Sequence, residues 1–191
     1  MSATDRLGPL DSGGSAAATD PGGSVAEVAL RALEDADLDP LFELMRDPES
    51  VRMAAFTAPD PDDRAAFDAH QARVRSAPDV IQRAVTCDGR FVGSIACFVV
   101  DGDTELTYWI DRSVWGQGIA GRALAAFLDL VPVRPLHARA AGDNIRSVRV
   151  LQRAGFRVVG TEVSYANARG TEIEETLLRL AQPPPHPGRT A

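Results

Sequence analysis

The segment that most constrains this chain is a glycine-rich run between a predicted strand and a predicted helix. The run reads Trp115-Gly116-Gln117-Gly118-Ile119-Ala120-Gly121. Glycines let the backbone turn tightly and approach a ligand without a Cβ in the way. The first N–H groups of a helix lack intrahelical partners, and the helix dipole adds partial positive charge there. The pattern therefore predicts a site for a phosphate or diphosphate group.

Length and composition predict one folded domain between two tails. The chain has 191 residues, of which 45% are hydrophobic, as is usual for a single globular domain. Residues 1–24 are rich in Gly, Ser, Ala and Asp, and residues 181–191 are rich in Pro. Neither segment has a periodic apolar pattern, so both are predicted to be disordered tails around a domain at residues 25–180.

Membrane-spanning and signal patterns, together with the cysteines, indicate the cellular compartment to expect. No apolar run is long enough to span a membrane, and the N-terminal segment has no apolar signal core. The two cysteines, Cys87 and Cys97, fall on predicted strands joined at Asp88-Gly89. In that hairpin Cys87 would face Arg90 and Cys97 would face Val80, so the cysteines cannot pair with each other. Reduced thiols and a cytoplasmic location are therefore expected.

Charge is distributed unevenly along the chain. The net charge of −7 argues against a protein that binds nucleic acid through general charge. Between residues 112 and 157, however, there are eight arginines and only two acids. This local excess predicts an anionic ligand near the glycine run. The chain has no lysine, so no mechanism can use a lysine amine, and the histidines show no metal-ligand spacing.

The apolar patterns predict an α/β fold. Helical periodicity is found at residues 37–46, 61–76, 119–130 and 145–154. Strand-like segments are found at residues 25–33, 80–87, 91–100, 105–110, 136–140, 156–163 and 173–180. Antiparallel strands come first and strand–helix units follow, which predicts a mixed central sheet.

A dinucleotide site is one alternative for the glycine run. Gly116-x-Gly118-x-x-Gly121 fits the G-x-G-x-x-G pattern, and Asp143 lies at a suitable distance for a ribose contact. In such folds, however, the turn comes directly off the first strand, whereas here residues 111–114 intervene and several elements precede. A P-loop is excluded because no Gly-Lys-Ser/Thr follows.

Four separated motifs favour another family. They are Glu105–Asp111, Trp115–Ala120, Asn144-x-x-Ser147 and Arg153–Phe156. Together they resemble the GNAT superfamily of acyl-CoA-dependent N-acetyltransferases, within it the branch of Rim-type ribosomal-protein N-terminal acetyltransferases. The resemblance covers residues 25–180. It implies a mixed, mostly antiparallel central sheet flanked by helices.

The same resemblance implies an activity. The expected reaction transfers an acetyl group from acetyl-CoA to a primary amine, by direct attack in a ternary complex and without a metal. The acceptor stays open between a protein N-terminus and a small-molecule amine, and a homodimer is common in the family. A non-catalytic acyl-CoA-binding or interaction domain is the alternative from another class, and a nicotinamide-dinucleotide-binding protein is a weaker one.

The resemblance also implies roles for individual residues. Glu105 would be the general base and Ser147 the group that protonates the departing thiolate, because the tyrosine of many relatives is replaced by Leu151 here. A backbone N–H near Ile110 would stabilise the tetrahedral intermediate. The residues expected to contact the coenzyme are Tyr108, Trp109, Ile110, Trp115, Gly116, Gln117, Gly118, Ile119, Ala120, Gly121, Asn144 and Ser147.

Overall fold

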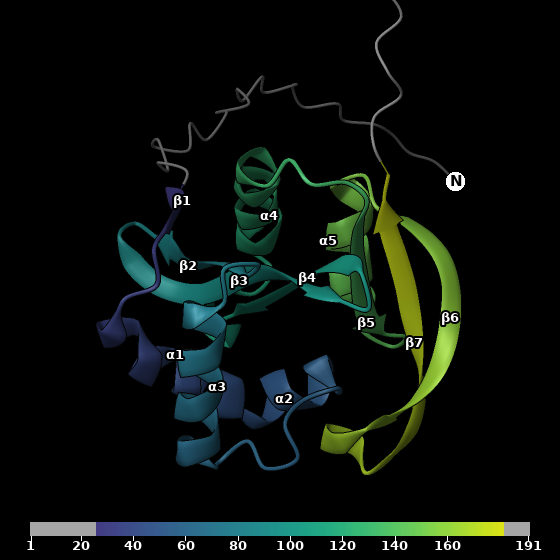
Figure 1. Ribbon diagram of the computed structural model, residues 1–191, viewed down its shortest axis with the longest axis horizontal. Helices are drawn as coiled ribbons and strands as arrows, with labels where there is room; N and C mark the ends of the chain where they lie inside the picture. The colour runs from purple at the N-terminus through teal and green to yellow at the C-terminus, as the bar shows by residue number, and fades with distance from the viewer. Residues whose placement is uncertain (1–25, 182–191) are drawn as a thin grey trace, which may run out of the picture.

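The computed structural model describes residues 26–181, which form one sheet covered by helices on both faces (Figure 1). The predicted tails, 1–24 and 181–191, lie outside the described residues apart from Ala181. The strands are β1 (Val28–Arg31), β2 (Ile81–Cys87), β3 (Arg90–Val100), β4 (Asp103–Ile110), β5 (Leu136–Ala141), β6 (Arg157–Ala166) and β7 (Thr171–Leu180). The helices are α1 (Leu38–Arg46), α2 (Pro48–Ala54), α3 (Arg64–Ser76), α4 (Ile119–Leu130) and α5 (Ile145–Arg153), with 3-10 turns η1 (Asp35–Asp37), η2 (Arg112–Val114) and η3 (Asn167–Arg169).

The seven strands follow the order β1-β2-β3-β4-β5-β7-β6. All neighbours pair antiparallel except β4 and β5, which pair in parallel only at residues 104–106 and 136–138. Beyond these pairs, residues 107–110 of β4 have no partner on β5. We call the gap between residues 107–110 of β4 and residues 139–141 of β5 the wedge. The predicted mixed, mostly antiparallel sheet flanked by helices is confirmed.

The wedge opens onto two chemically different faces of the sheet. Successive side chains of a strand point to opposite faces. Leu106 and Ile110 belong to the core cluster that contains Phe127 of α4, so the even-numbered residues of β4 face α4 and α5. The odd-numbered residues, Glu105 and Trp109 among them, face the side that α1, α2 and α3 cover (Figure 1).

Helix α4 is held against the sheet by a buried apolar stripe. Ile119, Ala123, Leu124 and Phe127 are each at most 1% exposed, and their spacing puts them on one helical face. Burying an Ile, Leu or Phe side chain contributes about 1.5–3 kcal/mol. The predicted helix over 119–130 is confirmed, and its packing fixes the position of its N-terminus.

The hairpin between β2 and β3 also forms as predicted. Asp88 and Gly89 both have positive φ angles, 48° and 76°, as a two-residue type I′ turn requires. Cys87 faces Arg90, but a bulge between Val85 and Thr86 shifts the register, so Cys97 faces Ile81 rather than Val80. The two cysteines are unpaired, as expected.

Several regions differ from the sequence-based expectation; β1 is shorter than the predicted 25–33, and α3 starts at Arg64 rather than at residue 61. Helix α2 was not predicted, because seven residues carry too little periodicity to stand out. Strand β6 continues to Ala166, past the predicted end at residue 163, because each of its last residues pairs with β7. Within residues 26–181, no helix has the length and apolar content needed to cross a bilayer.

Candidate active site

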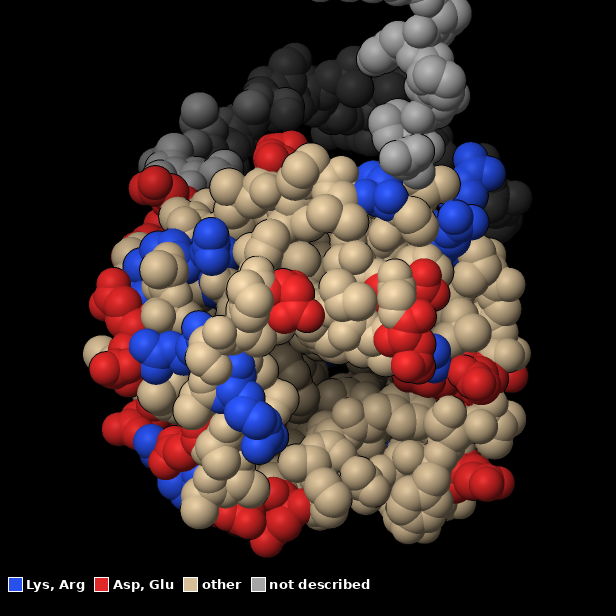
Figure 2. Space-filling view, viewed as in Figure 1, with Lys and Arg blue, Asp and Glu red and all other residues tan. Residues whose placement is uncertain are grey.

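One cleft passes through the wedge from one face of the sheet to the other. Its volume is about 610 Å³. It is lined by parts of α2, β4, β5, the glycine turn, the first turn of α4 and the exposed face of α5, together with Glu175 of β7. Figure 2 shows the opening on the α1–α3 side as a central hollow with both acidic and basic side chains around it.

The structure gathers almost all of the predicted site residues around this cleft. Gln117 is the exception, because its exposed side chain points away and donates to the main-chain oxygen of Ser113 (3.4 Å). The predicted residues that line the cleft are Glu105, Tyr108, Trp109, Ile110, Trp115, Gly116, Gly118, Ile119, Ala120, Gly121, Asn144 and Ser147.

The glycine turn presents the N-terminus of α4 to the cleft. Gly116 and Gly118 have φ angles of 80° and 74°, which residues with a Cβ rarely adopt. A Cβ built on Gly121 would meet no atom within 4 Å, so the space in front of the first helical turn is open. The turn follows η2 and the fourth strand of a mostly antiparallel sheet. This is not where a dinucleotide turn lies in a parallel fold.

Trp115 fastens the turn to the end of β4. Its indole Nε1 donates a hydrogen bond to the main-chain oxygen of Ile110 (2.7 Å). The guanidinium of Arg146 lies 6.0 Å from the centre of its ring, at the outer limit of a cation–π contact.

Three arginines on α5 give this end of the cleft a positive charge. Arg146, Arg149 and Arg153 all line the cleft. Among the described residues, none of them forms an ion pair with an acidic side chain. The helix N-terminus and these free cations together make an environment suited to a multiply charged anion.

The edge of β4 along the wedge carries backbone groups that have no strand partner. The N–H of Asp111 donates to the main-chain oxygen of Val92 on β3 (2.8 Å). Because backbone groups alternate direction along a strand, those of Tyr108 and Ile110 point to the opposite edge, toward the wedge. No described strand pairs with that edge beyond Leu106. An extended, amide-containing ligand could therefore hydrogen-bond there.

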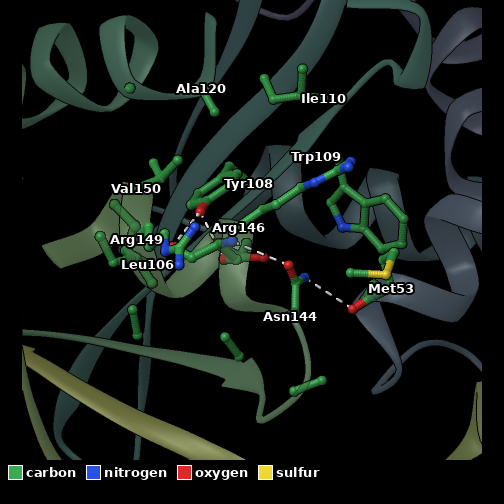
Figure 3. A pocket seen from close by; sticks show the side chains of 18 of the residues that line it. Met53, Leu106, Tyr108, Trp109, Ile110, Ala120, Asn144, Arg146, Arg149 and Val150 are labelled. Carbon is green, nitrogen blue, oxygen red and sulfur yellow. Dashed lines mark hydrogen bonds between the residues drawn. The ribbon is translucent and has the colours of Figure 1, made fainter. Parts of the chain in front are cut away.

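Asn144 holds the start of α5 in place. Its Oδ1 accepts from the N–H of Ser147 (3.1 Å), which makes it the N-cap of the helix. Its Nδ2 donates to the main-chain oxygen of Met53 (3.0 Å), as Figure 3 shows. Asn144 thus joins α5 to α2 across the cleft, and its amide keeps one N–H available for a ligand.

The two hydroxyl groups on the α4–α5 side of the wedge are hydrogen-bonded to each other. The phenol oxygen of Tyr108 lies 2.8 Å from the Oγ of Ser147 (Figure 3). Burial raises the pKa of Tyr108 to about 12, although the hydrogen bond with Ser147 acts in the opposite direction. The phenol is therefore neutral at physiological pH.

On the other face, one arginine bridges three carboxylates. Arg139 of β5 lies 3.1 Å from Glu105, 2.9 Å from Glu162 and 3.3 Å from Glu175. We call these four residues the carboxylate cluster. Burial alone would lower the pKa of Arg139, but the hydrogen bonds that it donates to Glu105 and Glu162 raise it. Glu175 is only 6% exposed, and this burial raises the pKa of its carboxyl group.

Sequence reasoning missed several of the lining residues. Met53 and Phe56 come from α2 and the segment after it, and the Asp47-Pro48 pair, an N-cap followed by proline, could have identified that helix. Arg139 and Glu175 carried no motif, because their contact depends on the pairing of β5 with β7. Among residues 26–181, no group of three His, Cys, Asp or Glu side chains could hold a metal ion.

Comparison with known proteins gives one family match and many similar folds. The profile of the acetyltransferase (GNAT) domain matches residues 27–157. No curated protein sequence matches the chain. A spermidine N-acetyltransferase from Vibrio cholerae, solved with CoA and spermine, is 17% identical with a TM-score of 0.69, over 81% of this chain and 95% of that one.

Two Rim-type enzymes also share the fold. RimJ from Mycobacterium smegmatis, solved with CoA-disulfide, is 24% identical over 81% of each chain, with a TM-score of 0.68. RimL, a ribosomal L7/L12 α-N-protein acetyltransferase solved with coenzyme A, is 18% identical over 84% of this chain and 96% of that one, with a TM-score of 0.67.

Proposed function

The chain belongs to the GNAT acetyltransferase family, and on that basis we propose that it transfers the acetyl group of acetyl-CoA to a primary amine. The resemblance inferred from the sequence is thus confirmed at the level of the family. One observation carries the proposal: the cleft runs through the wedge, from a cationic end at α4 and α5 to carboxylates on the opposite face. Two reactants could meet there from opposite sides.

The cationic end would hold the phosphates of the coenzyme. The unpaired N–H groups of the first turn of α4 would bind the diphosphate, with Gly121 leaving room for it. Arg146, Arg149 and Arg153 lie beside this position and would meet the remaining phosphate. Arginine suits this role because its fork of donors matches phosphate oxygens.

The pantetheine arm would run along the open edge of β4. Its two amides would hydrogen-bond to the backbone groups of Tyr108 and to the N–H of Ile110, in the manner of an added strand. The carbonyl of Ile110 is already engaged by Trp115. The acetyl group would then lie in the wedge, where the N–H of Ile110 could stabilise the developing oxyanion.

The acceptor amine would enter from the α1–α3 side. An alkyl ammonium must lose a proton before it can attack, and most of it is protonated at neutral pH. Glu105 would take that proton, directly or through a water. The amine nitrogen then bonds to the thioester carbon and loses its second proton to water. The C–S bond breaks, and its electron pair leaves on sulfur, close to Ser147.

The charge at the acceptor end favours a cationic amine. Three carboxylates surround one arginine in the carboxylate cluster, so the cluster carries net negative charge. Amines of this kind occur with two of the similar structures: one is a complex with spermine, and the other is a ribosomal L7/L12 α-N-protein acetyltransferase. We therefore place a polyamine and a protein N-terminus first among the acceptors.

An acceptor screen that follows release of free coenzyme A thiol tests the proposal. The panel should contain spermidine, short peptides with free N-termini and an aminoglycoside, each with a blocked-amine control. We expect thiol release with at least one free amine and with no blocked one. Coenzyme A binding without any turnover would instead support a non-catalytic acyl-CoA-binding domain.

A further inference from the structure

The contact between Tyr108 and Ser147 joins two elements that are distant in sequence. Tyr108 comes from β4 and Ser147 from the first turn of α5, and their side-chain oxygens are 2.8 Å apart. Four hydroxyl-bearing residues line the cleft: Ser50, Thr107, Tyr108 and Ser147. Of these, Thr107 is odd-numbered on β4 and faces the other side, and Ser50 belongs to α2. Tyr108 and Ser147 are therefore the hydroxyl-bearing residues that line the cleft on its α4–α5 face.

The direction of this hydrogen bond is assigned from the donor strengths of the two hydroxyls. A neutral phenol has one proton to donate, and the phenol of Tyr108 has two oxygens of Ser147 within reach. The Oγ is 2.8 Å away and the main-chain oxygen is 3.5 Å away. Either oxygen of the 2.8 Å contact can be the donor on geometry alone. A phenol is the stronger hydrogen-bond donor and an alkyl hydroxyl the stronger acceptor, so we assign the phenol as the donor to Oγ. Ser147 then accepts on its oxygen and its own proton is free to point into the cleft.

The backbone around Ser147 is also fixed. Its N–H is held by the Oδ1 of Asn144, which in turn is tied to Met53. Leu151, one turn further along α5, is 1% exposed and apolar, so it offers the cleft no hydrogen-bond donor. The backbone of Ser147 is therefore held in place, and its Oγ accepts a hydrogen bond from a single donor, Tyr108.

We propose that Tyr108 is a positioning residue, whose O–H donates to the Oγ of Ser147 and thereby aims the Ser147 O–H at the sulfur of the coenzyme. This rests on the proposed function. When the C–S bond breaks, the electron pair stays on sulfur and the thiolate accepts a hydrogen bond from Ser147. Both hydroxyl protons remain on their oxygens. Of the two protons that the ammonium loses in becoming an amide, one goes to Glu105 and the other to water. A hydrogen bond received by Ser147 strengthens the one that it donates.

The thiol pKa of bound coenzyme A tests this without turnover. The thiolate absorbs in the ultraviolet, so the pKa can be titrated in the complex as a difference spectrum against free protein. We expect a lower thiol pKa in the complex than in solution. We expect Ser147→Ala to raise it by about one unit, a tenfold change in the dissociation constant, and Tyr108→Phe to raise it by a similar amount. The double variant should match Ser147→Ala alone.

Kinetics provide the second measurement. Tyr108→Phe keeps the ring and should lower kcat about fivefold to tenfold, which is the effect of one hydrogen bond, with KM for acetyl-CoA within twofold. Tyr165→Phe is the matched control, because Tyr165 is the other tyrosine of the chain and is exposed on β6. It should leave both quantities unchanged.

The outcomes separate the two proposals. If coenzyme A binds neither to the wild type nor to any variant, the proposed function fails and this inference fails with it. If coenzyme A binds and Tyr108→Phe leaves the thiol pKa at the wild-type value, only the role of Tyr108 is overturned. The same holds if Tyr108→Phe slows the Ser147→Ala variant as much as it slows the wild type.

Discussion

The indole N–H of Trp115 donates to the main-chain oxygen of Ile110 over 2.7 Å. This bond connects the glycine turn, which presents the N-terminus of α4, to the strand edge that borders the wedge. The two parts of the proposed coenzyme site are therefore held at a fixed distance from each other. Without this bond, the Ile110 carbonyl would be left facing the wedge.

Replacing Trp115 by Phe removes the donor and keeps an aromatic ring. We expect the affinity for coenzyme A to fall about fivefold to tenfold, the effect of one hydrogen bond of about 1 kcal/mol. Isothermal titration of the purified variant measures this. Val133→Ala is the control, because Val133 is exposed and lies outside the cleft. Equal affinities for the Trp115→Phe variant and the wild type would contradict the role of the indole.

Glu105→Gln tests the proposed base. The amide keeps the shape of the side chain but cannot accept a proton, so we expect kcat to fall about 100-fold or more. Coenzyme A affinity should stay within twofold, because Glu105 faces the side opposite α4 and α5. Steady-state kinetics and titration separate the two effects. Glu172→Gln, at an exposed position of β7, is the control and should behave as wild type. An undiminished kcat in Glu105→Gln would rule out Glu105 as the base.

Arg139→Gln tests the carboxylate cluster. It leaves the buried carboxylate of Glu175 without its cation, so we expect the free energy of unfolding to fall by about 1–3 kcal/mol at neutral pH. A second change, Glu175→Gln, should restore much of this loss, because the buried group is then uncharged. Urea denaturation of both variants provides the comparison, and additive effects of the two changes would contradict it.

The loss in Arg139→Gln should also depend on pH. Burial raises the pKa of the Glu175 carboxyl group above its ordinary 4.5. The folded variant therefore holds the proton of this carboxyl group more tightly than the unfolded chain does. Stability from that proton is fully present below 4.5 and is lost as pH rises through the raised value. The difference in the free energy of unfolding between Arg139→Gln and the wild type should therefore shrink as pH falls. A difference that stays constant with pH would contradict the role of Glu175.

The sequence was most informative where structure is set locally. The glycine turn and α4 were predicted correctly because Gly116 and Gly118 supply positive φ angles and the stripe from Ile119 to Phe127 has a clear helical period. The Asp88-Gly89 turn was predicted for the same reason. The bulge beside Val85 was not, since it arises from the fit of two strands, and it moved the predicted partner of Cys97 by one residue.

The parts of the site that were missed depend on contacts between distant segments. Tyr108 was expected to contact the coenzyme, but its hydrogen bond with Ser147 was not predicted, because the two residues are 39 positions apart in the chain. Glu175 and Arg139 meet only once β5 and β7 have paired. No local pattern distinguishes such residues from ordinary charged side chains of a sheet.

The central claim, that the N-terminus of α4 holds coenzyme A, is tested most directly by titrating coenzyme A into the wild type and into Gly121→Leu. A Cβ at Gly121 meets no neighbour within 4 Å, and leucine favours a helix over glycine, so the variant should be at least as stable as the wild type. Its side chain would occupy the space proposed for the diphosphate. We predict one binding site in the wild type and at least a tenfold loss of affinity in the folded variant, about 1.4 kcal/mol. No binding to the wild type, or equal binding to both proteins, would contradict the account.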